Sequence, residues 1–228
     1  MKKKISSKTI IQYMVRVAIF GSIAIILYTI PFLSFSLPIF PSFLEFHFDE
    51  IPALIAGLAY GPYTAIGILV LKTIIKLPFT STMTVGDISD LFFSLAFILP
   101  TAFIYRKYKN LSGLSIGLSV GFLSQLIVAI LGNIYVVLPV YLFVLGMSQE
   151  SILHACQLIN PSVTDLQWTY GLYVVLPFNA IKDAIVIAVT ILVYLPMRKY
   201  FAQIGNLSLS QDIADSNDTN STDRIDRK

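Results

Sequence analysis

Five long runs of apolar residues constrain this chain more than any other feature of its sequence. They cover residues 11–30, 50–77, 87–105, 113–142 and 170–197. About 20 consecutive apolar residues form a helix that crosses the hydrocarbon core of a bilayer, which is roughly 30 Å thick. The runs lack the strict alternation of apolar and polar residues that a transmembrane barrel requires. The sequence therefore predicts an all-α membrane protein.

The composition excludes an ordinary soluble domain. Hydrophobic residues make up 56% of the 228 residues and charged residues 13%, about half the charged share of a typical soluble domain. The formal net charge is +3, and the basic residues lie beside apolar runs. We therefore expect a lipid bilayer as the environment and no nucleic acid as a partner. The first run is long for a secretory signal and lacks a cleavage site, so we expect it to be retained.

A Gly61-Pro62 pair inside the second run decides the number of spans, because proline removes a backbone donor and disfavours helix at the preceding residue. Lys and Arg gather in three places, within residues 2–16, 106–109 and 198–199. With a break at the pair, all three groups lie on one side of the membrane, as the positive-inside rule favours. We therefore predict six transmembrane helices with cytoplasmic N- and C-termini.

This arrangement makes specific demands on the remaining segments. Residues 50–60 are too few to cross a bilayer unaided, so other helices must shield them. We interpret the three outward connections, which hold no Lys or Arg, as covers over a site; they are 31–49, 78–86 and 146–168. Residues 1–200 form the transmembrane domain in this prediction, and the polar residues 201–228 form a disordered cytoplasmic tail.

Polar side chains inside apolar runs are the main functional candidates, since they are costly in lipid. Lys182 and Asn179 are three residues apart and share a helix face. Lys182 faces a pocket, extends outward to the membrane interface, or pairs with a carboxylate of another helix. Asn133, which precedes Pro139, either lines a site or forms a hydrogen bond between helices.

Charged residues at the ends of the runs allow simpler interpretations. Asp87 follows a glycine at a helix start, where capping explains it, whereas Asp90 lies one turn further in and is the better functional candidate. We interpret Lys72 and Lys76 as side chains that extend toward the membrane interface.

The segment Phe43–Glu50 alternates in polarity, which predicts an extended loop with two faces. Glu45, His47 and Asp49 share one face, and an aromatic face would pack over the helices. A metal site is the less favoured alternative, and Asp49 with Glu50 could also cap the next helix.

The sequence lacks the usual material of an enzyme. It has two His and one Cys, so an internal disulfide is excluded. It contains no Walker A motif, no Gly-x-Ser-x-Gly and no His-Glu-x-x-His. We expect no catalytic residues, no metal and no cofactor.

Several segments in order resemble the S components, the substrate-binding subunits, of energy-coupling factor (ECF) transporters, and among them the riboflavin-specific members. The resemblance covers roughly residues 10–200, and it is carried by Phe46–Pro62, Gly86–Asp90, Leu99–Arg106, Asn133 with Leu138-Pro139, and Pro177–Lys182.

This resemblance implies a six-helix bundle with a vitamin pocket near the outer surface, closed by the first outward loop. It implies that the residues at Asn133, Asn179 and Lys182 bind the flavin. We add four candidate contacts, which are Phe43, Leu44, Asp49 and Asp90. Asp87 and Asp90 depart from the Glu and Asn that are common in the family, which could alter loop capping or shift the ligand to a related compound.

The resemblance also implies partners. Ala18 and Ser22 form a small-xxx-small face that resembles the docking surface for the ECF transmembrane coupling subunit, which works with two ATPase subunits; packing within the chain is the alternative. The implied role is vitamin uptake by an ECF-type ABC importer, as a multi-pass protein of the bacterial plasma membrane that binds riboflavin at the extracellular side.

A flavin suits the candidate residues, because its flat ring has amide-like edges and its ribityl chain carries hydroxyls. A phosphate would require an Arg fork or several cations, so we favour riboflavin over the mononucleotide FMN. The alternatives are an S component for another vitamin or flavin analogue such as FMN or roseoflavin, an ion-coupled secondary carrier, or a membrane assembly factor.

Overall fold

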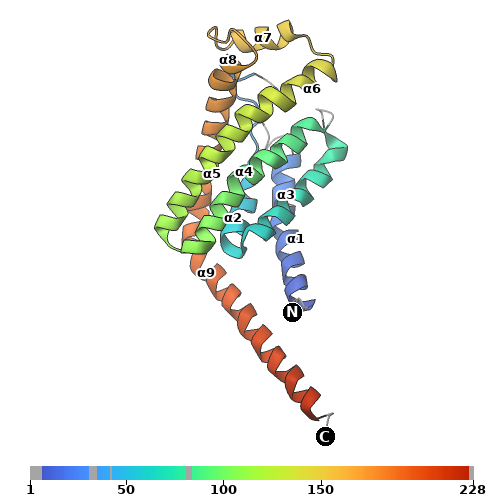
Figure 1. Cartoon of the computed structure of the whole chain (residues 1–228), viewed down its shortest axis with the longest axis vertical. Coiled ribbons are helices and arrows are strands. Elements are labelled where there is room, and N and C mark those ends of the chain that lie inside the picture. The colour runs from blue at the N-terminus through green and yellow to red at the C-terminus, as the bar shows by residue number, and fades with distance from the viewer. Residues whose placement is uncertain (1–6, 31–34, 42, 81–83, 226–228) are drawn as a thin grey trace.

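A computed structural model describes residues 7–30, 35–41, 43–80 and 84–225 of the chain. Side chains are described up to Phe201 and at Gln203. Within these residues the fold is a helical bundle without a sheet (Figure 1). The elements are α1 (Ser7–Thr29), α2 (Glu50–Tyr60), α3 (Pro62–Lys76), the short 3₁₀ turn η1 (Leu77–Phe79), α4 (Val85–Tyr108), α5 (Leu111–Gly132), η2 (Asn133–Val137), α6 (Leu138–Phe143), α7 (Gln149–Gln157), α8 (Trp168–Tyr170), η3 (Gly171–Val175) and α9 (Leu176–Ile225).

The predicted break between the second and third helices is confirmed. Gly61 separates α2 from α3 with φ +102°, a left-handed value that glycine adopts without a steric penalty. Pro62 is the first residue of α3, where a missing backbone donor costs nothing. The predicted shielding of α2 is also confirmed, because most of its side chains are buried.

Five of the described helices are long and apolar enough to cross a membrane, and α2 is too short for this. The five are Ser7–Thr29, Pro62–Phe79, Val85–Tyr108, Leu111–Phe143 and Trp168–Phe201. At 1.5 Å per residue, the 11 residues of α2 extend about 16 Å. The count of six transmembrane helices therefore stays a prediction.

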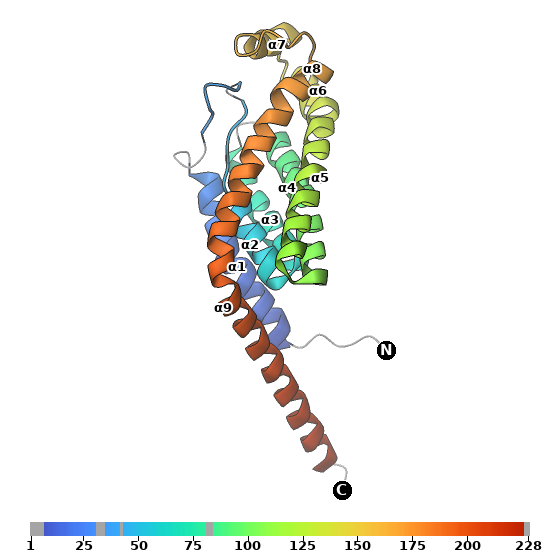
Figure 2. The same cartoon turned by 90° about the vertical axis from the view of Figure 1, so that its left-hand side faces the viewer.

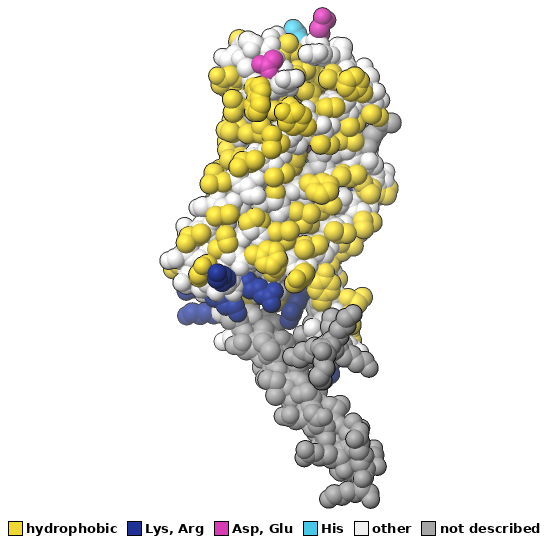
Figure 3. Space-filling view, in the orientation of Figure 1, with side chains coloured by type: hydrophobic (Ala, Val, Ile, Leu, Met, Phe, Trp, Pro, Cys, Tyr) yellow, Lys and Arg dark blue, Asp and Glu magenta, His cyan; other side chains and the backbone are white. Residues whose placement is uncertain are grey.

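The surface agrees with the charge argument. Apolar side chains cover the helical part of the visible face, and Lys and Arg gather at one end (Figure 3). The described parts of α1 and α9 extend toward this same end, while α7 and α8 lie at the opposite end (Figures 1 and 2). The assignment of the basic end to the cytoplasm stays a prediction.

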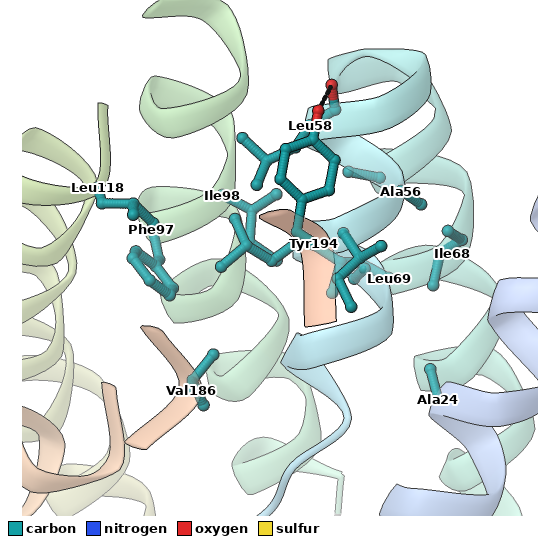
Figure 4. Close-up of a cluster of buried hydrophobic side chains, with 14 of the residues drawn as sticks. Ala24, Ala56, Leu58, Ile68, Leu69, Phe97, Ile98, Leu118, Val186 and Tyr194 are labelled. Atoms are coloured by element: carbon teal, nitrogen blue, oxygen red, sulfur yellow. Dashed lines mark hydrogen bonds between the residues drawn. The ribbon is translucent and has the colours of Figure 1, made fainter. Parts of the chain in front are cut away.

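The main core lies where α2 packs between α3, α4 and α9. Leu58, Leu69, Ile98 and Tyr194 belong to this buried cluster (Figure 4). The Tyr194 hydroxyl donates to the Leu58 carbonyl oxygen at 3.4 Å, so the polar tip of this aromatic residue has a partner inside the core.

Helices α4 and α5 approach closely because glycines face the contact. A Cβ added at Gly117 would lie 2.9 Å from the Thr101 carbonyl oxygen, and one at Gly121 would collide with Thr101 Oγ1 and the Phe97 carbonyl. The Thr101 hydroxyl donates to the carbonyls of Phe97 and Gly117, at 2.9 and 3.0 Å, and so joins the two helices. Small residues at such crossings let transmembrane helices pack backbone to backbone.

Helix α9 continues beyond its apolar part to Ile225. The candidate span ends at Phe201. The predicted disorder of residues 201–228 is not tested and stays a prediction.

Candidate functional site

A cavity of about 280 Å³ lies inside the bundle. This volume is close to the lower end of the range for small-molecule pockets. Its walls come from α1, α3, α4, η2, α6, α9, the loop segment 43–47 and Thr80. The lining residues are Tyr28, Phe43, Leu44, Glu45, His47, Lys76, Thr80, Gly86, Asp87, Ser89, Asp90, Phe93, Asn133, Val137, Tyr141, Phe178, Asn179 and Lys182.

Six of the seven predicted contact residues line this cavity. They are Asn133, Asn179, Lys182, Phe43, Leu44 and Asp90. The seventh, Asp49, is fully buried and lies behind the cavity wall, where it accepts a hydrogen bond from Lys72. The structure thus brings together residues that are up to 139 positions apart, as the positions of Phe43 and Lys182 show.

Two short π-helical segments shape the walls near Asn133 and Asn179. Both segments, η2 and η3, interrupt longer α-helices. Pro139 and Pro177 follow them, and each proline leaves the carbonyl four residues earlier without its helical donor. Single-turn π segments are frequent at functional sites.

The two asparagines use their amides in the same way. Asn133 Nδ2 donates to the Ala129 carbonyl oxygen at 2.9 Å, and Asn179 Nδ2 donates to the Val175 carbonyl oxygen at 2.8 Å. Each bond holds the side chain against its own helix. Asn133 Oδ1 also accepts from the Tyr170 hydroxyl at 3.5 Å. Each Nδ2 carries a second hydrogen besides the one donated to its own helix.

Lys182 satisfies two of the three interpretations that the sequence left open, and its burial contradicts an outward extension. It lines the cavity, and its Nζ also donates to Glu50 Oε1 at 2.9 Å. The Ser94 hydroxyl donates to the same oxygen at 2.8 Å. Capping therefore does not explain Glu50, because its carboxylate is buried against α4 and α9.

The interpretation of Lys72 as a side chain that extends to the interface is wrong. Lys72 is fully buried and donates to Asp49 Oδ2 and, at 2.8 Å, to Asp90 Oδ2. The other oxygen of Asp90 lies 3.8 Å from Lys182 Nζ. Two carboxylates close to one ammonium group offset part of the free energy that its loss of hydration costs.

These contacts form a chain of alternating charges, which we call the charge chain. Its members are, in order, Asp49, Lys72, Asp90, Lys182 and Glu50, and its two ends are adjacent in sequence. The charge chain joins the start of α2 to α3, α4 and α9. It lies against the cavity, to which Asp90 and Lys182 contribute directly.

Tyr28 connects α1 to the same region. Its hydroxyl donates to Asp87 Oδ1 at 2.8 Å, so Asp87 has a partner on another helix in addition to its place in the first turn of α4. Lys76 Nζ donates to the Tyr28 carbonyl oxygen at 3.2 Å and lies over the Tyr28 ring. Lys76 thus lines the cavity, and its ammonium group is bonded to α1. It is therefore not a simple interfacial side chain.

The loop segment 43–47 forms one wall, and its extended form is confirmed at Phe46. Phe46 and Phe35 exchange backbone hydrogen bonds of 2.8 and 3.4 Å as an isolated antiparallel bridge. The Phe46 ring is fully buried, with its centroid 4.6 Å from that of Phe178. Phe46 of the predicted aromatic face thus packs on α9, and Glu45 and His47 face the cavity, but Leu44 also lines the cavity.

His47 is neutral in this environment. Burial lowers the pKa of its imidazole to about 4, and the nearby Asp90 carboxylate offsets only part of that effect. Its ring packs edge-on against Tyr28, with centroids 4.8 Å apart. Within the described residues there is no group of three or more His, Cys, Asp or Glu side chains that could hold a metal ion.

The three outward connections contribute unequally as covers. Thr80 and Gly86 line the cavity from the second connection. The third, around α7, supplies no lining residue and packs through Ile152 and Cys156 into the apolar cluster that holds Tyr141. Residues 31–34, 42 and 81–83 of the predicted covers lie outside the described residues.

The predicted small-residue face of α1 divides into two sides. Ala18 and Ser22 are exposed, and the Ser22 hydroxyl donates to the Ala18 carbonyl oxygen at 2.7 Å. Gly21 and Ala24 are buried, and an added Cβ at Gly21 would lie 2.8 Å from Leu71. Packing inside the chain therefore explains Gly21 and Ala24 but leaves Ala18 and Ser22 without an internal role.

Sequence reasoning missed several wall residues. Tyr28, Phe93 and Tyr141 are parts of apolar runs, where nothing in the sequence separates a wall residue from a core residue. Glu50 and Lys72 do not line the cavity, and the sequence pattern indicates only a helix cap for Glu50 and an interfacial side chain for Lys72. Their helical spacing gave no signal, because each finds its partner on a different helix.

The fold and the site together define a helical membrane protein with a polar pocket inside its bundle. Residues 12–194 match the family described as "ECF transporter, substrate-specific component", and the chain belongs to this family. Its members are substrate-binding components of transporters and are not enzymes. The resemblance seen in the sequence is therefore confirmed.

Individual relatives agree with this assignment. The chain is 28% identical over 197 residues to the riboflavin transporter FmnP of Bacillus subtilis (strain 168), which covers 85% of this chain and 95% of that protein. It is 24% identical over 189 residues to the riboflavin transporter RibU of Staphylococcus aureus (strain TCH60), covering 83% and 93%. A solved S component of a bacterial ECF transporter shares the fold, with a TM-score of 0.64 at 23% identity over 83% of this chain and 96% of that one.

Proposed function

We propose that this chain binds riboflavin in the described cavity, from the extracellular side of a bacterial cell membrane, for ATP-driven uptake by partner subunits. The observation that carries the proposal is the meeting of two carboxamides and one paired lysine, Asn133, Asn179 and Lys182, in one cavity that also has apolar and aromatic wall residues. The names of the two riboflavin transporters that the chain resembles support the same ligand.

The cavity divides into two chemical parts that suit a flavin. Phe43, Leu44, Val137 and Tyr141 supply apolar and aromatic surface for the flat isoalloxazine ring. Asn133 lies beside Val137 on η2, where an amide can bond to the polar edge of the ring.

The polar part of the cavity suits the ribityl chain. Asp90, Asn179 and Lys182 offer donors and acceptors to its hydroxyls. Lys182 is already paired with Glu50, and Lys76 is held by Tyr28, so neither ammonium is free of a partner. This arrangement favours a neutral ligand over a phosphate ester, because a phosphate would have to compete with existing partners.

The exposed face at Ala18 and Ser22 is the proposed docking surface for the transmembrane coupling subunit, which would act with two ATPase subunits. Both side chains are small and face away from the bundle, so another helix can approach the backbone of α1. Large apolar side chains surround them on the same exposed surface, including Val15, Ile19 and Ile23.

The direct test is flavin binding by the purified chain in detergent. We expect bound flavin to give visible absorbance, and we expect added riboflavin to lose its fluorescence as it stacks on the aromatic wall. Thiamine and biotin serve as competitors that should leave the signal unchanged. A colourless protein that fails to quench added riboflavin at micromolar concentration would remove riboflavin as the ligand.

A second test separates an S component from a secondary carrier. The chain alone in liposomes, with an ion gradient, should bind riboflavin but not accumulate it. Co-reconstitution with a coupling subunit and its ATPases should produce uptake that requires ATP. Accumulation driven by an ion gradient in the absence of partners would favour the carrier.

A further inference from the structure

Lys72 contacts the walls of the cavity without lining it. Its side chain is fully buried, and Lys72 is not among the lining residues. Its Nζ donates to Asp49, which follows the loop segment 43–48 (the wall segment 43–47 and Phe48), and to Asp90, which faces the cavity. It also lies 4.6 Å from the ring centroid of Tyr28, another wall residue. One ammonium group thus contacts the end of the loop, α4 and α1.

We propose that Lys72 is a positioning residue for ligand binding, which fixes the loop segment 43–48 and the Asp90 carboxylate in their binding geometry. The inference rests on the proposed riboflavin function and extends it to a residue that lies outside the cavity.

The loop depends on Lys72 because few other polar contacts hold its end. Phe46 is fixed by aromatic packing and by its bridge to Phe35. Toward α2, Asp49 is buried and makes its side-chain hydrogen bond to Lys72. Glu45 and His47 lie between these two fixed points and face the cavity. Loss of the ammonium would leave the Asp49 carboxylate buried without a partner, so the loop end would move to hydrate it.

Asp90 depends on Lys72 for its orientation. Its two oxygens lie toward different lysines, one 2.8 Å from Lys72 Nζ and the other 3.8 Å from Lys182 Nζ. Without Lys72, Asp90 is free to turn fully toward Lys182 and to compete with Glu50 for it. Lys182 would then lose the position in which Glu50 holds it, although the substitution lies on another helix.

The proposed role predicts a specific pattern for three variants. Lys72→Met removes the charge at similar length, Lys72→Arg keeps it, and Asp49→Asn weakens only the arm that reaches the loop. We expect Lys72→Met to release bound riboflavin faster than the unmodified chain by about tenfold or more. Lys72→Arg should restore much of the slow release, and Asp49→Asn should show an intermediate rate.

Hydrogen–deuterium exchange tests the same role without any ligand. We expect Lys72→Met and Asp49→Asn to speed exchange in the peptide that covers residues 35–49. The peptide that covers the start of α5, residues 111–118, should stay as protected as in the unmodified chain, because Gly117 there packs on Thr101 of α4, outside the loop and its ion pairs. Lys72→Arg should return the loop peptide toward the protection of the unmodified chain.

The two readouts separate the failure of this inference from the failure of the proposed function. If the unmodified chain does not bind riboflavin, the proposed function fails, and loop exchange still decides the role of Lys72. If Lys72→Met speeds exchange equally in both peptides, or leaves loop exchange and flavin release unchanged, the positioning role is overturned. If Lys72→Met does not fold, Asp49→Asn decides: unchanged loop exchange and release in that variant would overturn the proposal.

Discussion

Lys182 of α9 donates a hydrogen bond to Glu50 of α2 across 2.9 Å, although 132 residues separate them in the chain. Both side chains are almost fully buried, with 4% and 1% of their surface exposed. A buried ion pair is costly to assemble, and removal of one partner leaves an uncompensated charge in a medium of low polarity. This pair therefore fixes the start of α2 against α9 at the side of the cavity.

The first prediction concerns this pair. Lys182→Met should lower the free energy of unfolding in detergent by about 3–5 kcal/mol, because it leaves the Glu50 carboxylate buried without its cation. The double variant Lys182→Met with Glu50→Gln should recover a large part of this loss, which thermal unfolding of the four proteins of the cycle measures. Additive losses in the double variant would contradict a direct interaction.

The second prediction concerns Asn133. Asn133→Ala should weaken riboflavin binding by at least about 1 kcal/mol, because a polar edge of the ligand would lose its partner in a desolvated cavity. Fluorescence quenching titrations measure the affinity. Asn110→Ala is the matched control: Asn110 Oδ1 accepts from the Gly113 amide at 2.6 Å and caps α5 at the other end of the helix. Equal losses of affinity in the two variants would argue against contact between Asn133 and ligand.

The third prediction concerns the charge of the ligand. FMN should bind more weakly than riboflavin by about tenfold or more, a difference of about 1.4 kcal/mol. Three carboxylates line the cavity, those of Glu45, Asp87 and Asp90, against two ammonium groups that already have partners. Glu45→Gln removes the carboxylate nearest to solvent and should narrow the difference, as competition titrations would show. Equal affinities for both flavins would contradict the proposed excess of negative charge.

The fourth prediction concerns the pH dependence that His47 contributes. Burial lowers its pKa in the folded protein to about 4, below its ordinary value of 6.5. The unfolded chain therefore binds a proton between pH 6.5 and pH 4 that the folded chain does not, and this stability contribution is complete above pH 6.5 and is lost as the pH falls. As the pH falls from 6.5 to 4, the unfolding temperature should decrease less steeply in His47→Gln than in the unmodified chain. Parallel pH profiles of the two proteins would contradict a buried neutral imidazole.

The fifth prediction tests the contact of α4 with α5. Gly121→Ala should destabilise the fold by about 1–3 kcal/mol, because its Cβ would collide with Thr101 Oγ1 and the Phe97 carbonyl oxygen. Neither atom can move aside easily, because the carbonyl is part of the α4 backbone and the Thr101 hydroxyl is hydrogen-bonded. Ser119→Ala, on the exposed face of the same helix, is the control and should leave the unfolding temperature nearly unchanged. Similar unfolding temperatures for the two variants would mean that the helices separate at little cost.

The helical class and the approximate limits of the helices follow from the sequence because they depend on local properties. The apolar run at 113–142 corresponds to the continuous span Leu111–Phe143, and the Gly61-Pro62 pair separates α2 from α3 as predicted. Each of these features needs only a window of adjacent residues, since backbone hydrogen bonds in lipid must be made within the helix itself.

The candidate residues Asn133, Asn179 and Lys182 also follow from the sequence, because a polar residue in an apolar run is conspicuous by itself. Their meeting in one cavity was an implication of family resemblance, not of spacing. The surrounding wall, including Tyr28 and Tyr141, had no such signal, since aromatic residues are ordinary members of apolar runs.

The polar residues in the apolar runs were thus determined by the sequence alone, but the partners of those residues were decided by the tertiary structure. Lys72 shows the difference: local rules placed it at a membrane interface, whereas the packed bundle buries it between Asp49 and Asp90. The physical reason is that an ion pair across helices depends on the distance between two backbones that are remote in sequence. Local pattern sets the cost of placing a charge in the membrane, and only the assembled bundle supplies the opposite charge that offsets it.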